Sequence, residues 1–179
     1  DKDINDINSD EYEKLIEKTI IINVQADQPF IDPSLIKNLL DSFFEKGELF
    51  DVMTPVYKLR PENIHNPNYV KVLLSHDLDA IYFSRLALPY IRGIEKERWY
   101  EMNDYWGHIG IYLFKANILS KWFKLPISKL EKLEKLEQLR FIDAKLIIKT
   151  IRVESETFSI DTQEQLIKAR EIANSVDKI

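Results

Sequence analysis

The run at residues 20–33, IIINVQADQPFIDP, restricts the fold more than any other part of the chain. It opens with β-branched residues, too few to cross a membrane, which predict a strand buried on both faces of a sheet. Asp32 followed by Pro33 is typical of a helix N-terminus. The residues that then recur at helical spacing are Leu35, Ile36, Leu39, Leu40 and Phe43. The order strand, loop, helix indicates an α/β fold.

Asp27 lies in the polar loop between that strand and that helix. Ligands of open α/β sheets bind beyond the carboxyl ends of the strands, which is where Asp27 would project. A loop aspartate also commonly does no more than stabilise a turn. Position alone leaves both roles open.

Composition limits the partners and the class of protein. The chain has 179 residues, 45% of them hydrophobic and 31% charged, which predicts one soluble globular domain. A net charge of -5 gives no basic surface for nucleic acid, and no run of about 18 uncharged apolar residues predicts a membrane helix. The absence of cysteine fits a reducing cytoplasm. We therefore expect no nucleic-acid partner, no membrane partner and a cytoplasmic location.

The middle of the chain predicts antiparallel structure. Two β-type runs, at 69–75 and 80–85, are joined by a connection short enough for a hairpin, which we expect beside the main sheet. Residues 87–105 lack periodicity and predict an irregular excursion. The whole of 57–106 is thus an expected antiparallel subdomain or excursion within a single domain spanning 1–179.

A further strand is predicted at residues 107–115, GHIGIYLFK. Alternation places His108, Gly110 and Tyr112 on one face, expected to be polar, and apolar residues on the other. A lone histidine on a strand is more often structural than a ligand. Gly110 in a strand interior, however, often marks the close approach of a ligand or another backbone.

Residues 128–143 predict one helix that begins with a capping box and carries a leucine at every third position. Glu137 and Arg140 fall inside the apolar arc of that helix. A buried carboxylate needs a partner, so one interpretation is an ion pair of Glu137 with Arg140 or another base. The other is that Glu137 and Gln138 line a polar ligand pocket.

The C-terminal part predicts a strand at 145–153 and then a helix that begins beside Asp161. The expected buried stripe of that helix is Leu166, Ala169, Ala173 and Val176. Asp161 is read as a helix cap or as a metal ligand. Two loop carboxylates, Asp27 and Asp161, suit Mg²⁺, which takes one or two carboxylates and leaves its other positions for water and phosphate oxygens.

Several segments in order resemble one family, the 3-deoxy-manno-octulosonate (KDO) cytidylyltransferases. The matching segments are NVQADQPFI at 23–31, DVMTPV at 51–56, NPNYVKVLL at 66–74, AIYFSRLALPYIR at 80–92, HIGIYLF at 108–114, LEKLEKLEQLR at 130–140 and IDTQEQL at 160–166. The YFSR, HIGIY and LEQLR segments are the most specific.

The resemblance implies a Rossmann-like nucleotide-diphospho-sugar transferase fold with a mixed sheet. It implies a homodimeric enzyme that couples CTP to KDO, releasing pyrophosphate and giving CMP-KDO for lipopolysaccharide assembly. Asp27 and Asp161 would be the catalytic Mg²⁺ ligands. The sugar site would comprise Arg85, His108, Tyr112, Glu137 and Gln138, with the planar fork of Arg85 suited to the carboxylate of KDO.

The sequence departs from the family pattern in several places. The family loop V-Q-G-D-E-P has Ala26 and Gln28 in place of its glycine and glutamate, and Gly107 replaces a commonly basic residue. The phosphate-binding segment I-P-A-R…S-R-L-P-G-K-P and the A-T-D and S-G-T-D-R segments do not occur. We therefore expect the C-terminal two-thirds of such an enzyme, without its N-terminal strands and inactive alone.

Two alternatives remain open. The first is a non-catalytic descendant that binds an acid sugar or a protein partner. The second is a cytidylyltransferase for a related acid sugar, such as an amino-substituted KDO or a sialic-acid-like nonulosonate.

Overall fold

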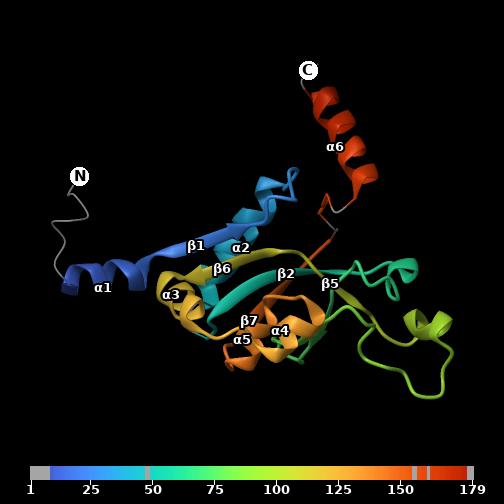
Figure 1. Cartoon of the computed structure of the whole chain (residues 1–179), viewed down its shortest axis with the longest axis horizontal. Helices are drawn as coiled ribbons and strands as arrows, with labels where there is room; N and C mark the ends of the chain where they lie inside the picture. The colour runs from blue at the N-terminus through green and yellow to red at the C-terminus, as the bar shows by residue number, and fades with distance from the viewer. Residues whose placement is uncertain (1–8, 47–48, 155–156, 161, 177–179) are drawn as a thin grey trace.

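The computed structural model describes residues 9–46, 49–154, 157–160 and 162–176. Within these residues, seven strands form one mixed sheet in the order β1-β6-β2-β5-β3-β4, with β7 paired to β2 (Figure 1). The strands are β1 (Ile20–Val24), β2 (Val52–Lys58), β3 (Lys71–Leu74), β4 (Ala80–Ser84), β5 (Trp106–His108), β6 (Ile111–Lys115) and β7 (Ile148–Val153).

The helix expected after Asp32 and the one expected near the C-terminal end are present, whereas the sequence did not predict the helix at 116–124. The α-helices are α1 (Ser9–Lys18), α2 (Pro33–Lys46), α3 (Ala116–Lys124), α4 (Lys129–Glu134), α5 (Leu139–Asp143) and α6 (Gln163–Val176), with short 3-10 helices η2 (Pro61–Asn63) and η3 (Lys96–Glu101). Asp32 caps α2 as predicted, since its Oδ1 accepts a hydrogen bond of 2.8 Å from the backbone N–H of Ser34. No helix in the described ranges has both the length and the apolar character needed to span a bilayer.

Two apolar clusters lie on the two faces of the sheet. Leu35, Leu39 and Phe43 of α2 pack with alternate residues of β2 and β6, such as Met53 and Leu113. The second cluster joins the other face of the same strands to α3 and α5. It includes Val52, Val56, Tyr112, Phe114, Ile118, Leu139 and Phe141. Alternate residues of β2 and β6 therefore face the two clusters, and both faces of these two strands are buried.

Strand direction brings three strand ends together. β1 and β2 are both antiparallel to β6, and β7 is parallel to β2, so β1, β2 and β7 run the same way. Their carboxyl ends therefore lie at one edge of the sheet. The loop with Asp27 follows β1 there, as predicted, and residues 157–160 follow β7.

The prediction that the first strand is buried on both faces is wrong. Among the described strands β1 pairs only with β6, at the end of the sheet, and Val24 is 43% exposed. β-branched residues suit an edge strand as well as a central one, so composition did not distinguish the two.

The hairpin of β3 and β4 is antiparallel, as predicted, but it does not lie beside the main sheet. β5 pairs with both β2 and β3, so the hairpin extends the same sheet. Residues 87–105 contain only η3 as regular structure, which confirms the irregular excursion. The division of the chain into one domain with 57–106 as a subdomain stays a prediction.

Two predicted continuous elements are broken. The strand at 107–115 is interrupted after His108 and resumes at Ile111, and its expected polar face packs Tyr112 into an aromatic cluster. The leucine-rich helix ends at Glu134 because Lys135 takes a left-handed conformation (φ 57), and α5 begins at Leu139. The capping box of Ser128 and Glu131 is present.

The last helix does not bury its predicted stripe. α6 projects away from the sheet (Figure 1). Of the expected stripe, Ala169 is buried, Leu166 half-buried and Ala173 exposed, and the side chain of Val176 lies outside the described residues. Helical spacing predicted the helix but not whether a neighbour covers it.

Candidate active site

A cavity of about 510 Å³ lies at the shared edge of β1, β2 and β7. It is lined by residues from seven separate stretches of the chain. Those named by the sequence analysis are Asp27, Arg85, His108, Tyr112, Glu137 and Gln138. Others in the lining include Gln25, Gln28, Tyr57, Asn66, Asn68, Lys135, Thr157, Ser159 and Thr162. Asp161 lies outside the described residues.

The loop that carries Asp27 is fixed by the segment after β7. The backbone N–H of Ile160 donates to the carbonyl of Asp27 at 2.8 Å. The hydroxyl of Thr157 donates to Oε1 of Gln28 at 3.3 Å. The residues just before Asp161 in sequence are therefore hydrogen-bonded to the Asp27 loop.

The carboxylate of Asp27 is suited to a cation. Its Oδ1 is buried and has no hydrogen-bond partner in the described part of the chain. Burying a carboxylate oxygen that accepts no hydrogen bond costs free energy unless a cation binds to it. Mg²⁺ needs only one or two protein carboxylates, so this residue fits that ion. In the described ranges no group of three or more His, Cys, Asp or Glu residues forms a site enclosed by protein ligands alone.

Gly110 allows the Asp27 loop to approach β6 closely. A Cβ added there would lie 3.2 Å from Cγ of Gln25 and 3.4 Å from Nε2 of Gln28. The sequence analysis expected a close approach at this glycine, and the structure confirms it. Nε2 of Gln25 also donates to Oε1 of Glu137 at 3.2 Å, so the loop contacts the α4–α5 connection.

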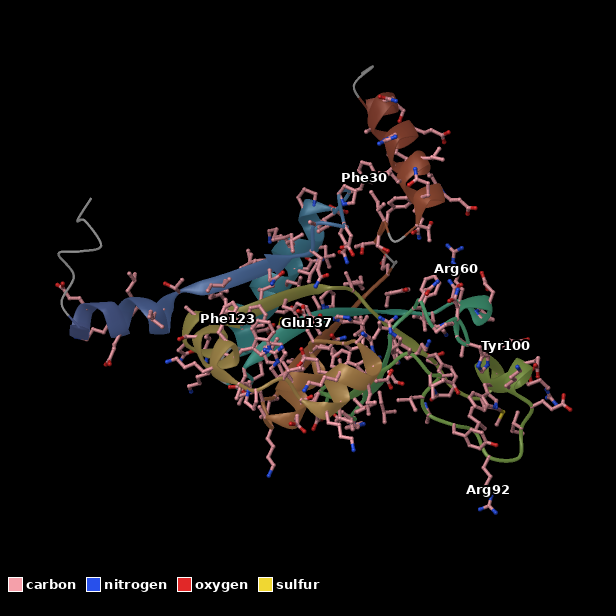
Figure 2. The ribbon with its side chains drawn as sticks, in the orientation of Figure 1. Phe30, Arg60, Arg92, Tyr100, Phe123 and Glu137 are labelled. Atoms are coloured by element: carbon pink, nitrogen blue, oxygen red, sulfur yellow. The ribbon has the colours of Figure 1, made fainter. Side chains whose placement is uncertain are left out.

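Glu137 and Gln138 owe their position to the break after α4. Glu137 is half-buried and lies near the centre of the molecule (Figure 2), whereas the Gln138 side chain is buried. The suggested ion pair of Glu137 with Arg140 is not formed. Arg140 instead donates through Nε to Oε2 of Glu131 at 2.7 Å. The break turns Glu137 toward the cavity, so the pocket interpretation describes its position better.

Arg85 is held in place by backbone carbonyls. Its Nε donates to the carbonyl of Glu134 at 2.9 Å and its Nη1 to that of Pro67 at 3.0 Å. Nη2 makes no hydrogen bond to any described residue, and the side chain lines the cavity. A guanidinium fixed on one side and unengaged on the other can bind an anionic group of a ligand.

His108 and Tyr112 form part of an aromatic group on the cavity wall. Their ring centroids are 5.3 Å apart, and Phe83 lies 5.1 Å from the imidazole. Burial lowers the pKa of His108 from 6.5 to about 3. Burial, with the Glu137 carboxylate nearby, raises the pKa of Tyr112 well above its usual value. At neutral pH both groups are therefore uncharged hydrogen-bonding partners.

Gly107, where the family commonly has a basic residue, packs against the ring of Tyr57. A Cβ at this position would lie 2.7 Å from Cε1 and Cζ of Tyr57. The Tyr57 ring therefore occupies the space that a side chain at position 107 would need, and Tyr57 itself lines the cavity.

Sequence reasoning missed several residues of this site. Gln25 and the asparagines at 66 and 68 line the cavity, but they lie in polar loops, where such residues are common. Lys71, the first residue of β3, does not line the cavity but supports the loop at 66–68: it is fully buried, and its Nζ donates to the carbonyls of Asn66 at 2.8 Å and Tyr69 at 2.6 Å. A lysine inside an apolar strand run was the available signal, because such a charge needs partners when buried.

Comparison with known proteins identifies relatives of the chain. Residues 8–151 match the sequence model of a family described as cytidylyltransferase. The chain is 41% identical over 151 residues to the 3-deoxy-manno-octulosonate cytidylyltransferase of Elusimicrobium minutum, covering 84% of this chain and 60% of that protein. It is 39% identical over 154 residues to the enzyme of the same name from Porphyromonas gingivalis, with the same coverage of 84% and 60%.

A solved structure shows the same fold. It is CMP:2-keto-3-deoxy-manno-octonic acid synthetase complexed with CTP, which matches with a TM-score of 0.77 and 32% identity over 96% of this chain and 70% of that chain. This likeness confirms the predicted Rossmann-like transferase fold with a mixed sheet. The chain spans about 60% of the length of the curated relatives named above.

Proposed function

Because the chain belongs to the cytidylyltransferase family, we propose that the complete protein transfers CMP from CTP to KDO and releases pyrophosphate. The named relatives are KDO cytidylyltransferases, and the solved neighbour is described with CTP. The observation that carries the proposal is the single cavity that gathers Asp27, Arg85, His108, Glu137 and other predicted residues.

The cavity wall suits an acid sugar. Arg85 offers Nη2 to the sugar carboxylate, since its Nε and Nη1 are already engaged by carbonyls. Glu137 and Gln138 offer acceptors and donors for hydroxyl groups, and the phenol of Tyr112 stays protonated and able to donate. The guanidinium of Arg85, held by backbone carbonyls, beside several neutral or acceptor groups suits a ligand with a carboxylate and several hydroxyls.

The reaction needs positioning more than covalent chemistry. The anomeric hydroxyl oxygen of the sugar forms a bond to the α-phosphorus of CTP, the bond from that phosphorus to the pyrophosphate oxygen breaks, and the hydroxyl proton passes to solvent water. The residues of the cavity hold the sugar hydroxyl near the nucleotide, which lowers the entropic cost of the encounter.

Asp27 and Asp161 are the proposed Mg²⁺ ligands, and the unpartnered Oδ1 of Asp27 supports this assignment. When bound, Mg²⁺ would neutralise phosphate charge as pyrophosphate departs. Gln28, which replaces a family glutamate, accepts from Thr157 and keeps the Asp27 loop attached to the segment after β7. The glutamine therefore still provides an acceptor that links these two segments.

The test is CTP-dependent and Mg²⁺-dependent pyrophosphate release with KDO, measured on the product of the complete gene. Asp27→Asn should lower kcat by about a hundredfold or more, the size of effect that follows loss of one electrostatic contact to a transition state. Asp32→Asn is the matched control, because Asp32 is exposed and asparagine also caps helices. Absence of pyrophosphate release, or equal activity of the two variants, would contradict the proposal. KDO binding without turnover would favour the non-catalytic alternative.

The proposed partner in solution is a second copy of the chain. Large apolar side chains of the excursion are exposed: Leu86 at 73%, Tyr90 at 71%, Tyr100 at 49% and Met102 at 62%. Figure 2 shows Tyr100 on this excursion, away from α6 and from Phe30. Sedimentation should show a dimer that Tyr90→Glu weakens. An unchanged dimer would place the interface elsewhere.

The proposed place of this activity is the cytoplasm, ahead of lipopolysaccharide assembly. Its substrate CTP is made there, and CMP-KDO is an activated sugar suited to glycosyl transfer. Competition between KDO and amino-substituted or nonulosonate acid sugars would identify the preferred substrate.

A further inference from the structure

Thr54 lies under the aromatic wall of the cavity. It is fully buried in the middle of β2, on the face shared by Val52 and Val56. Its Oγ1 is 2.9 Å from Nε2 of His108. The same oxygen is 2.8 Å from the carbonyl of Ile111 and 3.2 Å from that of Ile109, on either side of the strand break.

Counting protons fixes the direction of each hydrogen bond. A threonine hydroxyl has one proton to donate, and a backbone carbonyl can only accept. The Ile111 carbonyl oxygen is only 2.8 Å from Oγ1, and two oxygens this close repel each other unless a proton lies between them, so the Thr54 proton points to this carbonyl. The contact with His108 is then satisfied only if Nε2 carries a proton and donates it to Oγ1.

The rest of the ring follows from this assignment. A neutral imidazole has one N–H, so Nδ1 is left with a lone pair. No hydrogen bond among the described residues uses Nδ1, and the side chain lines the cavity. The ring does not take up a second proton at neutral pH, because burial between Phe83 and Tyr112 lowers the pKa of His108 to about 3.

We propose that Thr54 is a positioning residue that holds His108 in the Nε2–H tautomer, so that Nδ1 accepts a hydrogen bond from a hydroxyl of the bound sugar. The identity of that ligand rests on the proposed function. The tautomer itself does not, since it follows from contacts within the chain. A neutral acceptor at this point of the wall selects a hydroxyl and disfavours a carboxylate or phosphate oxygen, which has no proton to donate. The carboxylate of the sugar is thereby directed toward Arg85.

The proposal is tested with Thr54→Val, which keeps the shape of the side chain but removes the hydroxyl, and with Thr54→Ser, which keeps the hydroxyl. The chain has three histidines, so ¹⁵N-histidine labelling gives a short spectrum that a His108→Gln variant assigns. Long-range ¹H–¹⁵N spectra of the wild type should show Nε2 protonated and Nδ1 unprotonated. Thr54→Ser should keep this pattern, and Thr54→Val should shift it toward a mixture of tautomers.

Titration with KDO supplies the second measurement. Thr54→Val should weaken KDO binding by about threefold to tenfold, the range for one hydrogen bond, and Thr54→Ser should bind as the wild type does. A protonated Nδ1 in the wild type, or the same spectrum in Thr54→Val, would overturn the proposal. If the spectra behave as expected but the wild type does not bind KDO, the proposed function fails and the assignment of Thr54 to the tautomer stands. If Thr54→Val no longer folds, Thr54→Ser must still match the wild type in both measurements, and a changed tautomer there would overturn the proposal.

Discussion

Replacing Gly107 with alanine should destabilise the chain, although the change adds a single methyl group. A Cβ at this position would lie 2.7 Å from two ring carbons of Tyr57 and 2.9 Å from Cδ2 of Leu59. Carbon atoms in contact normally stand about 3.5 to 4.0 Å apart. Tyr57 is 5% and Leu59 4% exposed, so relieving the contact requires displacing side chains that are packed in the protein. Overpacking of this kind costs about 1 to 3 kcal/mol.

Urea unfolding followed by tryptophan fluorescence measures this cost, since Trp99 and Trp106 lie near the altered contact along the chain. The urea concentration at the midpoint of unfolding should fall, while the slope of the unfolding free energy against urea concentration should stay the same. This combination indicates a change in stability rather than in the compactness of the folded or unfolded chain. Tyr57→Leu makes space, so Gly107→Ala should cost less in that background than in the wild type. A Gly107→Ala variant as stable as the wild type, or an equal cost in both backgrounds, would refute the packing argument.

Three further outcomes follow from the site. His108 stays neutral in the folded chain down to about pH 3 but is protonated near pH 6.5 when unfolded, so stability should fall as pH drops through this window. By pH 5 the loss in the free energy of unfolding is on the order of 2 kcal/mol. In urea unfolding experiments, the stability of His108→Gln should fall by that much less than the stability of the wild type over the same pH range. Burial lowers the pKa of Lys71 from 10.5 to about 8, so the unfolded chain holds more protons between these values and stability should rise with pH there. Lys71→Met should flatten that rise, and an unchanged slope would contradict the assignment. Gly110→Ala should change stability little, because Gln25 and Gln28 can shift by a few tenths of an ångström, but it should weaken KDO binding by displacing the contact of Gln25 with Glu137.

Local sequence patterns predicted most of the elements correctly because each depends on neighbours in the chain. Asp32 and Pro33 mark the start of α2, and Ser128 with Glu131 forms the capping box of α4. Such signals involve residues two to four positions apart. They hold whatever the rest of the fold does.

The errors arise where distant segments decide the outcome. No pattern within the sequence of β1 marks it as an edge strand, because its place in the sheet depends on pairing with β6, which is distant along the chain. The left-handed conformation of Lys135 breaks the leucine-rich helix without a glycine to signal it. That break is what directs Glu137 toward Gln25 rather than Arg140.

The candidate site itself was predictable only through resemblance to a family. The spacing of residues did not decide whether Asp27 stabilises a turn or binds a ligand. It also did not decide whether His108 is structural or functional. Its supporting residues were not predictable at all, because Thr54 acts through His108, which lies 54 positions away along the chain. Hydrogen bonds over such separations leave no local pattern.

The central claim is that the cavity binds an acid sugar through Arg85. Calorimetric titration of KDO into the 179-residue chain tests it most directly. Arg92→Gln is the matched control, because Arg92 is exposed and points outward at the far side of the excursion (Figure 2). We predict that the wild type and Arg92→Gln bind KDO alike and that Arg85→Gln binds about tenfold more weakly or worse, the loss expected for charge-assisted hydrogen bonds. No binding by the wild type, or equal binding by Arg85→Gln in a chain with unchanged circular dichroism, would contradict the claim.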